Sequence, residues 1–381
     1  MIFDKLIGDE RPLSWALRFW PVITASFIGS FAATWLCKKI AIKLGIVDKP
    51  DNLVKTHKEP VAYLGGIGIF FGFAVGTLAG LYGMHGEEYF ATAFKWLLGI
   101  LAGGAIACFI GVVDDILDIK PIQKIGGQLI AAFALVAAGI LPDFQVIAEY
   151  LSWDMPAIIN LIIGAPFVLF VVLGSTNSLN LLDGLDGLCA GVTGIIGIAM
   201  LILSINLASW GWSDYGDPVR LIVCLGLIGG VFGFLPFNRH PAKIFMGDAG
   251  SMLLGFLVAA LFILFANQHP RWLMAGLVVF GLPILDTATA LLRRAINKKP
   301  LFVSDRGHIY DQMIDRGIPL KKTVAACYGL TALYAVIGLI LSQMRTRYSL
   351  LAIILVFGIS GLIVWKKGFL EMEGLRGARK K

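Results

Sequence analysis

Long apolar runs alternate with short polar segments along nearly the whole chain. A helix needs roughly 17–25 apolar residues to cross a hydrocarbon core about 30 Å thick. Eleven runs have about that length: 19–36, 64–82, 94–113, 123–141, 157–174, 188–207, 219–236, 250–267, 272–292, 324–342 and 348–365. Because lipid offers no partner to backbone N–H and C=O groups, each run is expected to be helical. The pattern predicts an all-α, polytopic membrane bundle of about eleven transmembrane helices.

Composition agrees with a membrane protein and narrows the function classes. Hydrophobic residues make up 57% of the 381 residues and charged residues 15%, against about 25% charged residues in a typical soluble domain. The five cysteines are scattered without a CxxC pair, which argues against a zinc site or a disulfide framework. The net charge is +7, and the basic residues are distributed as the membrane topology described next requires. No nucleic-acid partner is therefore expected.

Lysine and arginine residues divide the loops into two sets. Most of the 32 basic residues lie in one set of segments: 37–60, 114–124, 174–187, 237–249, 293–323 and the tail from 366. Three loops of the opposite set hold none: 83–93, 142–156 and 208–218. The basic side of a membrane protein is cytoplasmic. We therefore expect the N-terminus outside and the C-terminus in the cytoplasm, within a single domain spanning 1–381.

Acidic residues behave differently on the two sides. Those of the outer loops are spread among turn residues and are interpreted as solvated charges: Glu87, Glu88, Asp143, Glu149, Asp154, Asp214 and Asp217. The inner polar residues form compact clusters at the mouths of the spans, in 37–63, 114–124, 174–187, 237–251 and 293–323. A carboxylate at membrane depth is costly and indicates function. These five segments are the predicted active site.

The first cluster is Asp114, Asp115 and Asp118. On a helix, this spacing would place Asp114 and Asp118 on one face. Adjacent carboxylates repel each other, and a proton or a cation relieves the repulsion. Mg²⁺ prefers oxygen ligands and usually takes one or two carboxylates together with substrate phosphates. Solvated acids at a helix end are the alternative.

The second cluster repeats every three residues, at Asn177, Asn180, Asp183 and Asp186. On a continuous helix these side chains would lie on a single face. Gly184 and the glycine after Asp186 would let another chain or a ligand approach closely. The alternative is a polar stripe that holds neighbouring helices together.

The third cluster contains Phe245 and Asp248, just before an apolar span. Asp248 is interpreted as a metal ligand, with a helix cap as the alternative. Phe245 could stack on a nucleobase or simply pack at the membrane edge.

A fourth group contains Arg306 and His308, and Lys58 lies before the second span. Arginine suits bidentate phosphate contacts, and histidine can bind phosphate or metal or move protons. Acids, amides and cations on one membrane face favour Mg²⁺-assisted transfer between two phosphates. Two other classes remain as alternatives, a cation-coupled transporter and a non-catalytic lipid-binding scaffold.

These motifs resemble the polyprenyl-phosphate N-acetylhexosamine-1-phosphate transferase superfamily. The likeness runs from His57-Lys58-Glu59-Pro60 to His308, with the Asp-Asp pair, NxxNxxDGLDG and FMGDAGS in the same order. It implies ten or eleven helices with a cytoplasmic cleft, in a bacterial cytoplasmic (inner) membrane. The implied reaction moves a sugar-1-phosphate from a UDP-sugar to undecaprenyl or another polyprenyl phosphate. UMP is released and a lipid-linked cell-envelope glycan is initiated.

The resemblance also implies roles for individual residues. Asp248 would bind Mg²⁺ (Mn²⁺ is the alternative ion) with Asp115, and Asp114 or Asp115 would orient or deprotonate the lipid phosphate. Asn180, Asp183 and Asp186 would shape the nucleotide–metal site, with both aspartates counted among the catalytic residues. Asn177, Phe245 and Lys58 would bind the substrate. Arg306 and His308 would hold the sugar phosphate. A homodimer is left open.

The segment 305–311 bears on the choice of sugar. It reads Asp-Arg-Gly-His-Ile-Tyr-Asp, without the triple-histidine run of the phospho-N-acetylmuramoyl-pentapeptide transferases. It is similar to the N-acetylglucosamine branch, although Tyr310 and Asp311 stand where that branch usually has two histidines. N-acetylglucosamine-1-phosphate is therefore the expected group, and phospho-N-acetylmuramoyl-pentapeptide is the alternative.

Overall fold

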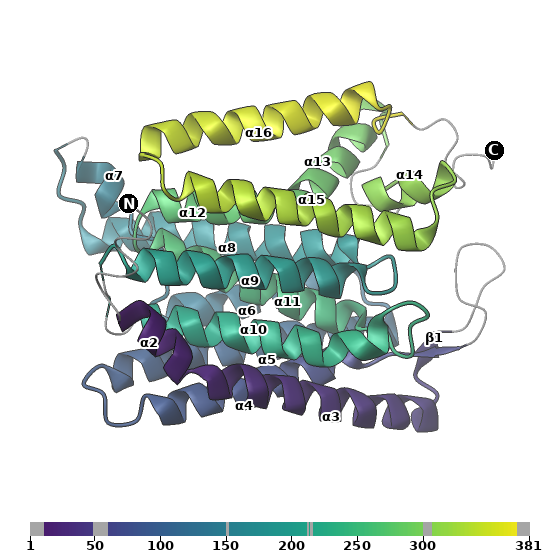
Figure 1. Ribbon diagram of the computed structural model, residues 1–381, viewed down its shortest axis with the longest axis horizontal. Coiled ribbons are helices and arrows are strands. Elements are labelled where there is room, and N and C mark those ends of the chain that lie inside the picture. Colours follow the sequence, from purple (N-terminus) through teal and green to yellow (C-terminus); the bar gives the residue numbers. More distant parts are fainter. Residues whose placement is uncertain are drawn as a thin grey trace.

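The computed structural model describes residues 11–48, 60–149, 152–211, 213, 216–299 and 307–371. Its long helices lie side by side along one direction (Figure 1). They are α2 (Arg11–Arg18), α3 (Trp20–Leu44), α4 (Gly65–Gly83), α5 (Phe90–Leu117), α6 (Pro121–Ala138), α7 (Gln145–Ala148), α8 (Ala157–Leu182), α9 (Leu188–Ala208), α10 (Gly216–Asn238), α11 (Gly247–Ala266), α12 (Pro270–Val279), α13 (Gly281–Ile296), α14 (Ile309–Asp315), α15 (Leu320–Leu341) and α16 (Thr346–Lys366). Two short strands, β1 (Val47–Asp48) and β2 (Val61–Ala62), pair antiparallel.

The predicted membrane bundle is confirmed. Within the described ranges, ten helices are long and apolar enough to cross a membrane. Helices α12 and α13 would make an eleventh span, bent by 72°. The bend lies inside the predicted span 272–292. It arises because Pro283 lacks the N–H that would bond to the carbonyl of Val279, the last residue of α12.

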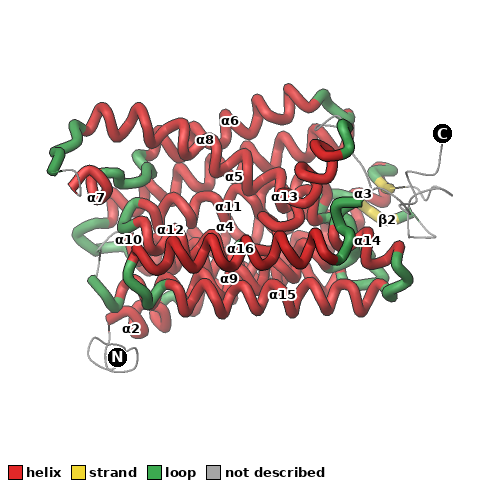
Figure 2. Tube along the Cα trace, turned by 90° about the horizontal axis from the view of Figure 1, so that it is seen from above, coloured by secondary structure: helices red, strands yellow, loops and turns green. Residues whose placement is uncertain are grey.

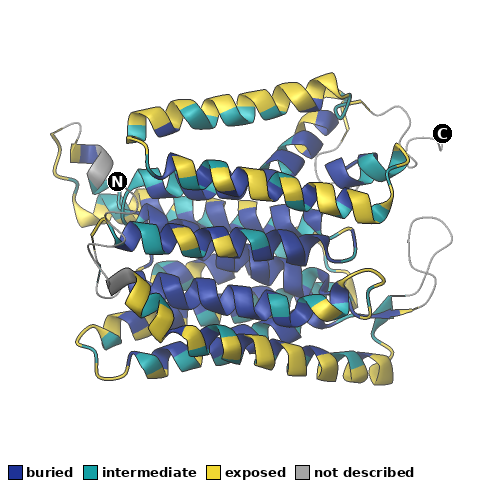
Figure 3. Ribbon diagram, viewed as in Figure 1, coloured by how far each residue is buried: buried dark blue, intermediate teal, exposed yellow. Residues whose placement is uncertain are grey.

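Helix α11 is the central element of the bundle. Every one of its residues except Asp248 is buried, whereas α16 at the edge buries only Ser349 and Val364 (Figure 3). Seen from above, α6 and α8 lie along one side of the bundle and α9 and α15 along the other (Figure 2). The helices around α11 therefore separate it from lipid.

Two neighbours approach α11 closely because they meet it through glycine. A Cβ atom at Gly111 of α5 would lie 2.3 Å from the Cα atom of Ala249. One at Gly255 of α11 would lie 2.4 Å from the Cα atom of Thr176 in α8. Contacts this short require hydrogen in place of a side chain. They bring the last turns of α5 and α8 beside the first turn of α11.

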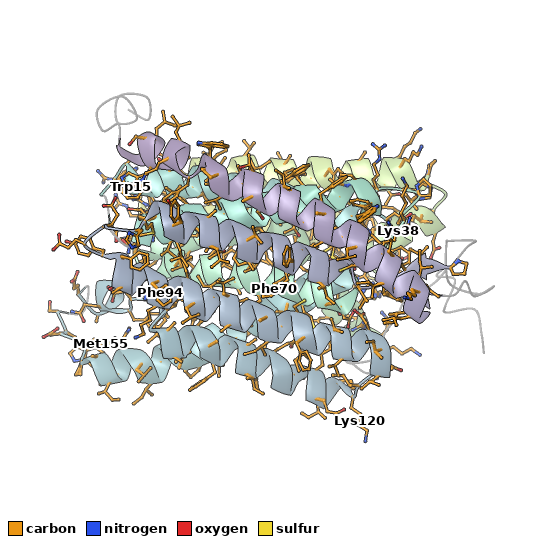
Figure 4. All side chains as sticks on the ribbon, turned by 90° about the horizontal axis from the view of Figure 1, so that it is seen from below. Trp15, Lys38, Phe70, Phe94, Lys120 and Met155 are labelled. Carbon is orange, nitrogen blue, oxygen red and sulfur yellow. The ribbon has the colours of Figure 1, made fainter. Side chains whose placement is uncertain are left out.

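The polar clusters gather at one end of the bundle, which we call the site end: the last turns of α5, α8 and α13, the first turns of α6 and α11, the strands and α14. Lys38 and Lys120 lie toward this end, and Trp15 and Phe94 toward the other (Figure 4). Basic residues on one side are what a cytoplasmic face requires. That orientation stays a prediction.

A charged pair at the opposite end of the bundle is fully buried. Arg220 of α10 pairs with Asp217, and both side chains are 0% exposed. Arg220 Nη1 also donates to the carbonyl of Leu264 at 3.2 Å, and the backbone N–H of Ser213 donates to Asp217 at 2.6 Å. The prediction that Asp217 is a solvated loop charge is therefore wrong. It lies inside α10, where a neighbouring arginine compensates its charge.

Candidate active site

The first turn of α11 is held by a carboxylate from the end of α5. Asp115 Oδ1 accepts from the backbone N–H of Asp248 at 2.8 Å, and Oδ2 from that of Ala249 at 3.2 Å. The first N–H groups of a helix have no partners within it, and a carboxylate there is stabilised by the helix dipole. The helix-capping role that was the alternative for Asp248 is therefore filled by Asp115. Its two hydrogen bonds also fix the position of Asp248.

Lys124 of α6 lies among oxygen atoms from three other helices. Its Nζ is 2.9 Å from Asp114 Oδ2 and 3.3 Å from Asn180 Oδ1, and it contacts Asp248 Oδ2. The side chains of Asp114, Lys124 and Asp248 are 13%, 17% and 29% exposed. We call Asp114, Lys124, Asn180 and Asp248 the open charge cluster, because all of its charged members reach solvent.

The predicted polar stripe at 177–186 is brought only partly into this cluster. Asn180 donates to Asp248 Oδ1 at 2.7 Å, whereas Asn177 donates to Gln128 Oε1 at 3.2 Å. The prediction of one continuous face is wrong because α8 ends at Leu182. The residues that follow leave the helical repeat.

The turn after α8 carries the remaining aspartates. Asp183 is the C-cap of α8, and burial, followed by the carboxylates nearby, raises its pKa well above the usual range. Asp186 Oδ2 pairs with His240 Nδ1 at 2.7 Å. Gly184 is confirmed as a point of close approach, since a Cβ there would lie 2.2 Å from the Tyr310 hydroxyl oxygen.

An aromatic edge borders the site end beside β2. The N–H of Phe245 donates to the carbonyl of Ala62 at 2.9 Å, and that of Gly65 to the carbonyl of Phe245 at 3.0 Å. The ring of Phe245 lies 6.0 Å from the ring of Tyr63 and is tilted by 59°. Phe245 is half-buried. Lys58 lies outside the described residues.

His308 lies between α13 and α14 and is nearly buried. Its Nδ1 is 2.7 Å from Asp286 Oδ2, and the N–H of Ile309 donates to Asp286 Oδ1 at 2.7 Å. The ring stacks on that of Tyr310, with centroids 5.6 Å apart and planes 9° apart. Arg306 lies outside the described residues.

One residue of the first cluster and one residue that follows it differ from expectation. Asp118 does not share a face with Asp114, because α5 ends at Leu117 and Asp118 is its exposed, left-handed C-cap with φ 47°. Lys124, which was missed, lies at the centre of the open charge cluster. The signal was available, since Lys124 is the only charged residue in the apolar run 123–141.

Comparison with known proteins finds similarity along nearly the whole chain. Residues 97–266 match the family described as glycosyl transferase family 4. A probable undecaprenyl-phosphate N-acetylglucosaminyl 1-phosphate transferase of Bacillus subtilis is 30% identical over 374 residues, covering 96% of this chain and 94% of that protein.

Two further relatives bear related names. A decaprenyl-phosphate N-acetylglucosaminephosphotransferase of Mycobacterium tuberculosis is 29% identical, covering 90% of this chain and 87% of that protein. An undecaprenyl-phosphate alpha-N-acetylglucosaminyl 1-phosphate transferase of Yersinia pestis is 29% identical, covering 82% of each. All four members of the open charge cluster lie within the matched segment 97–266.

Proposed function

Since the chain belongs to glycosyl transferase family 4, in the branch of the undecaprenyl-phosphate N-acetylglucosamine-1-phosphate transferases, we propose that it transfers N-acetylglucosamine-1-phosphate from UDP-N-acetylglucosamine to a polyprenyl phosphate. The open charge cluster supports this proposal most directly. Charged and amide side chains from α5, α6, α8 and α11 meet at the site end, where a lipid headgroup and a soluble nucleotide could both bind.

In the proposed reaction, an oxygen of the lipid phosphate attacks the sugar-bearing phosphorus of the UDP-sugar. A new P–O bond forms there, and the bond from that phosphorus to the bridging oxygen breaks. The bridging oxygen keeps the electron pair and leaves as part of UMP. Because both reactants are anions, the main work of the protein is positioning and charge neutralisation.

The donor set of the open charge cluster fits Mg²⁺. Asp114, Asp248 and Asn180 direct their oxygens at one nitrogen, the Lys124 ammonium, which stands in for a cation at this place. Mg²⁺ usually takes one or two carboxylates plus substrate phosphates, and Asp114 and Asp248 supply two carboxylates here. Bound there, Mg²⁺ would neutralise the charge that develops on the phosphate oxygens.

The remaining roles follow from what each side chain contacts. Both oxygens of Asp115 accept backbone N–H groups of α11, so we assign it to positioning Asp248. Asp114 is then the better candidate to orient or deprotonate the lipid phosphate. Lys124 lies where it can bind a phosphate oxygen.

The nucleotide and the sugar phosphate would occupy the rest of the site end. Asp183, Asp186 and Phe245 would border the place for the nucleotide, and Lys58, just before the second predicted span, would contact it. His308 and Arg306 would hold the sugar phosphate. We place the site end on the cytoplasmic face of a bacterial inner membrane, where the product would start a cell-envelope glycan.

The proposed reaction is tested by UMP release from purified protein reconstituted with undecaprenyl phosphate and Mg²⁺. Three donors are compared: UDP-N-acetylglucosamine, UDP-N-acetylgalactosamine and UDP-N-acetylmuramoyl-pentapeptide. Release with UDP-N-acetylglucosamine alone, dependent on the lipid and abolished by EDTA, is the expected result. Release with only the pentapeptide donor would move the chain to the alternative sugar.

A transporter remains the rival from a different class. Proteoliposomes that take up UDP-sugar without releasing UMP would contradict the transferase and favour the transporter. The geometry argues against it, because the open charge cluster lies at the ends of α5 and α8 and the starts of α6 and α11 rather than at mid-span.

A further inference from the structure

Asp286 is a buried carboxylate outside the open charge cluster. It lies in α13, the second half of the bent span, and is 1% exposed. An ionised carboxylate at such a place is costly unless donors compensate its charge. Asp286 therefore requires donors for both of its oxygens.

Both donors come from the start of α14. The backbone N–H of Ile309 donates to Oδ1 at 2.7 Å, and His308 Nδ1 lies 2.7 Å from Oδ2. An ionised carboxylate can only accept, so the proton of this contact belongs to Nδ1. Any contact between the imidazole and a substrate phosphate would then run through Nε2.

The surroundings also restrict how His308 can turn. Its ring is stacked on Tyr310 with planes 9° apart. The hydroxyl of Tyr310 in turn donates to the carbonyl of Leu181 at 2.8 Å, two residues before Asp183. The carbonyl of Gly307 is bound by Arg293 of α13 and by Gln312 Nε2 at 2.9 Å. The histidine is thus fixed on one side to α13 and on the other to the end of α8.

We propose that Asp286 is a positioning residue for the transfer reaction, which holds His308 in the Nδ1-protonated form with Nε2 directed to the phosphate of the donor. The inference rests on the proposed function, because it assigns His308 a substrate contact. A carboxylate that orients a functional histidine fixes both its tautomer and its ring orientation. Removing such a partner typically lowers activity by about 10- to 100-fold.

A double-mutant cycle on UMP release tests the role. Asp286→Asn is expected to lower kcat by about 10- to 100-fold, with little change in KM for undecaprenyl phosphate. In a His308→Gln background, Asp286→Asn should cause no further loss, because it acts through the histidine. Thr289→Val, which removes a buried hydroxyl one turn along α13, is the matched control and should keep its kcat. Additive losses, or normal turnover of folded Asp286→Asn, would overturn the proposal.

A second measurement uses the unaltered protein and does not depend on how Asp286→Asn folds. The chain has five histidines, so solid-state NMR of protein labelled with ¹⁵N-histidine, compared with His308→Gln, assigns the signals of His308. We expect a protonated Nδ1, and a His308 protonated only at Nε2 would contradict the geometry. Folded wild-type protein that releases no UMP would overturn the proposed function, whereas UMP release with an Nε2-protonated His308 would overturn this inference alone.

Discussion

Two groups of paired charges, one at each end of the bundle, differ in how far they are exposed to solvent. At the end opposite the site, Asp217 and Arg220 are 0% exposed and are bound by surrounding backbone groups. At the site end, Asp114, Lys124 and Asp248 are 13–29% exposed, with more carboxylates than cations. We call Asp217 and Arg220 the closed pair. It has little room for a substrate, whereas the side chains of the open charge cluster can exchange their partners. Exposure and surplus charge, rather than the presence of acids, distinguish a candidate site from a structural pair.

The largest expected effect is a loss of stability when the closed pair is broken. Asp217→Asn would leave Arg220 buried without its counter-charge and should lower the free energy of unfolding by about 3–5 kcal/mol. Denaturation of purified protein in mixed micelles measures this change. Turnover per folded molecule should stay within about twofold, since the pair lies at the far end.

The double variant Asp217→Asn, Arg220→Met controls for the loss of hydrogen bonds. It removes both charges and should be less destabilised than the single variant. If Asp217→Asn alone is as stable as wild type, the closed pair does not have the structural role assigned to it.

The second expected effect is on turnover rather than stability. Asp248→Asn keeps the size of the side chain but removes a charge from the open charge cluster. We expect UMP release to fall by about 100- to 1000-fold, as when a group that stabilises transition-state charge is lost. Insertion and the unfolding midpoint should be retained, and normal turnover would refute the assigned role.

The third prediction concerns the contact that brings the open charge cluster together. Gly111→Ala would place a methyl group 2.3 Å from Ala249 Cα, and overpacking of this kind costs about 1–3 kcal/mol. Gly126→Ala in α6 is the matched control, because nothing lies within 4 Å of its Cβ position and alanine favours a helix by up to about 1 kcal/mol. Equal unfolding midpoints for the two variants would contradict the close α5–α11 approach.

The smallest effect is expected at Asp118, which shares a sequence cluster with Asp114 but not its surroundings. Asp118 is an exposed C-cap, so Asp118→Asn should change stability by less than about 0.5 kcal/mol. UMP release should stay within about twofold of wild type. Asp114→Asn, assayed in parallel, should lose far more activity, and a similar loss in both would restore Asp118 to the site.

The length of the apolar runs was sufficient to predict the membrane spans, because the thickness of a bilayer sets the length of the helices that cross it. The break at residue 280 was missed since both halves are apolar, although Pro283 was a visible signal. The predicted stripe at 177–186 failed because periodicity assumed a helix that ends at Leu182. Spacing within one segment does not reveal where that segment stops.

The sequence could not predict which residues of different helices contact each other. Asp248 was identified as a candidate, but its contacts with Lys124 and Asn180 join α6, α8 and α11. Asp217 was misinterpreted because burial depends on the neighbours of a residue, not on its type. Asp286 and His308 lie 22 residues apart in the sequence, and only folding brings them into contact.

The burial of α11 has a consequence for how the protein meets membranes of different thickness. Helices that touch lipid adjust to hydrophobic mismatch by tilting, and α16, of which only Ser349 and Val364 are buried, is free to do so. Helix α11 has lipid-contacting helices around it and presents only Asp248 outside its packed surface. Glycine contacts hold it against its neighbours, at Ala249 in its first turn against Gly111 of α5 and at Gly255 in its third turn against α8. The geometry of the open charge cluster should therefore depend little on bilayer thickness, because the outer helices can tilt while α11 stays packed among its neighbours.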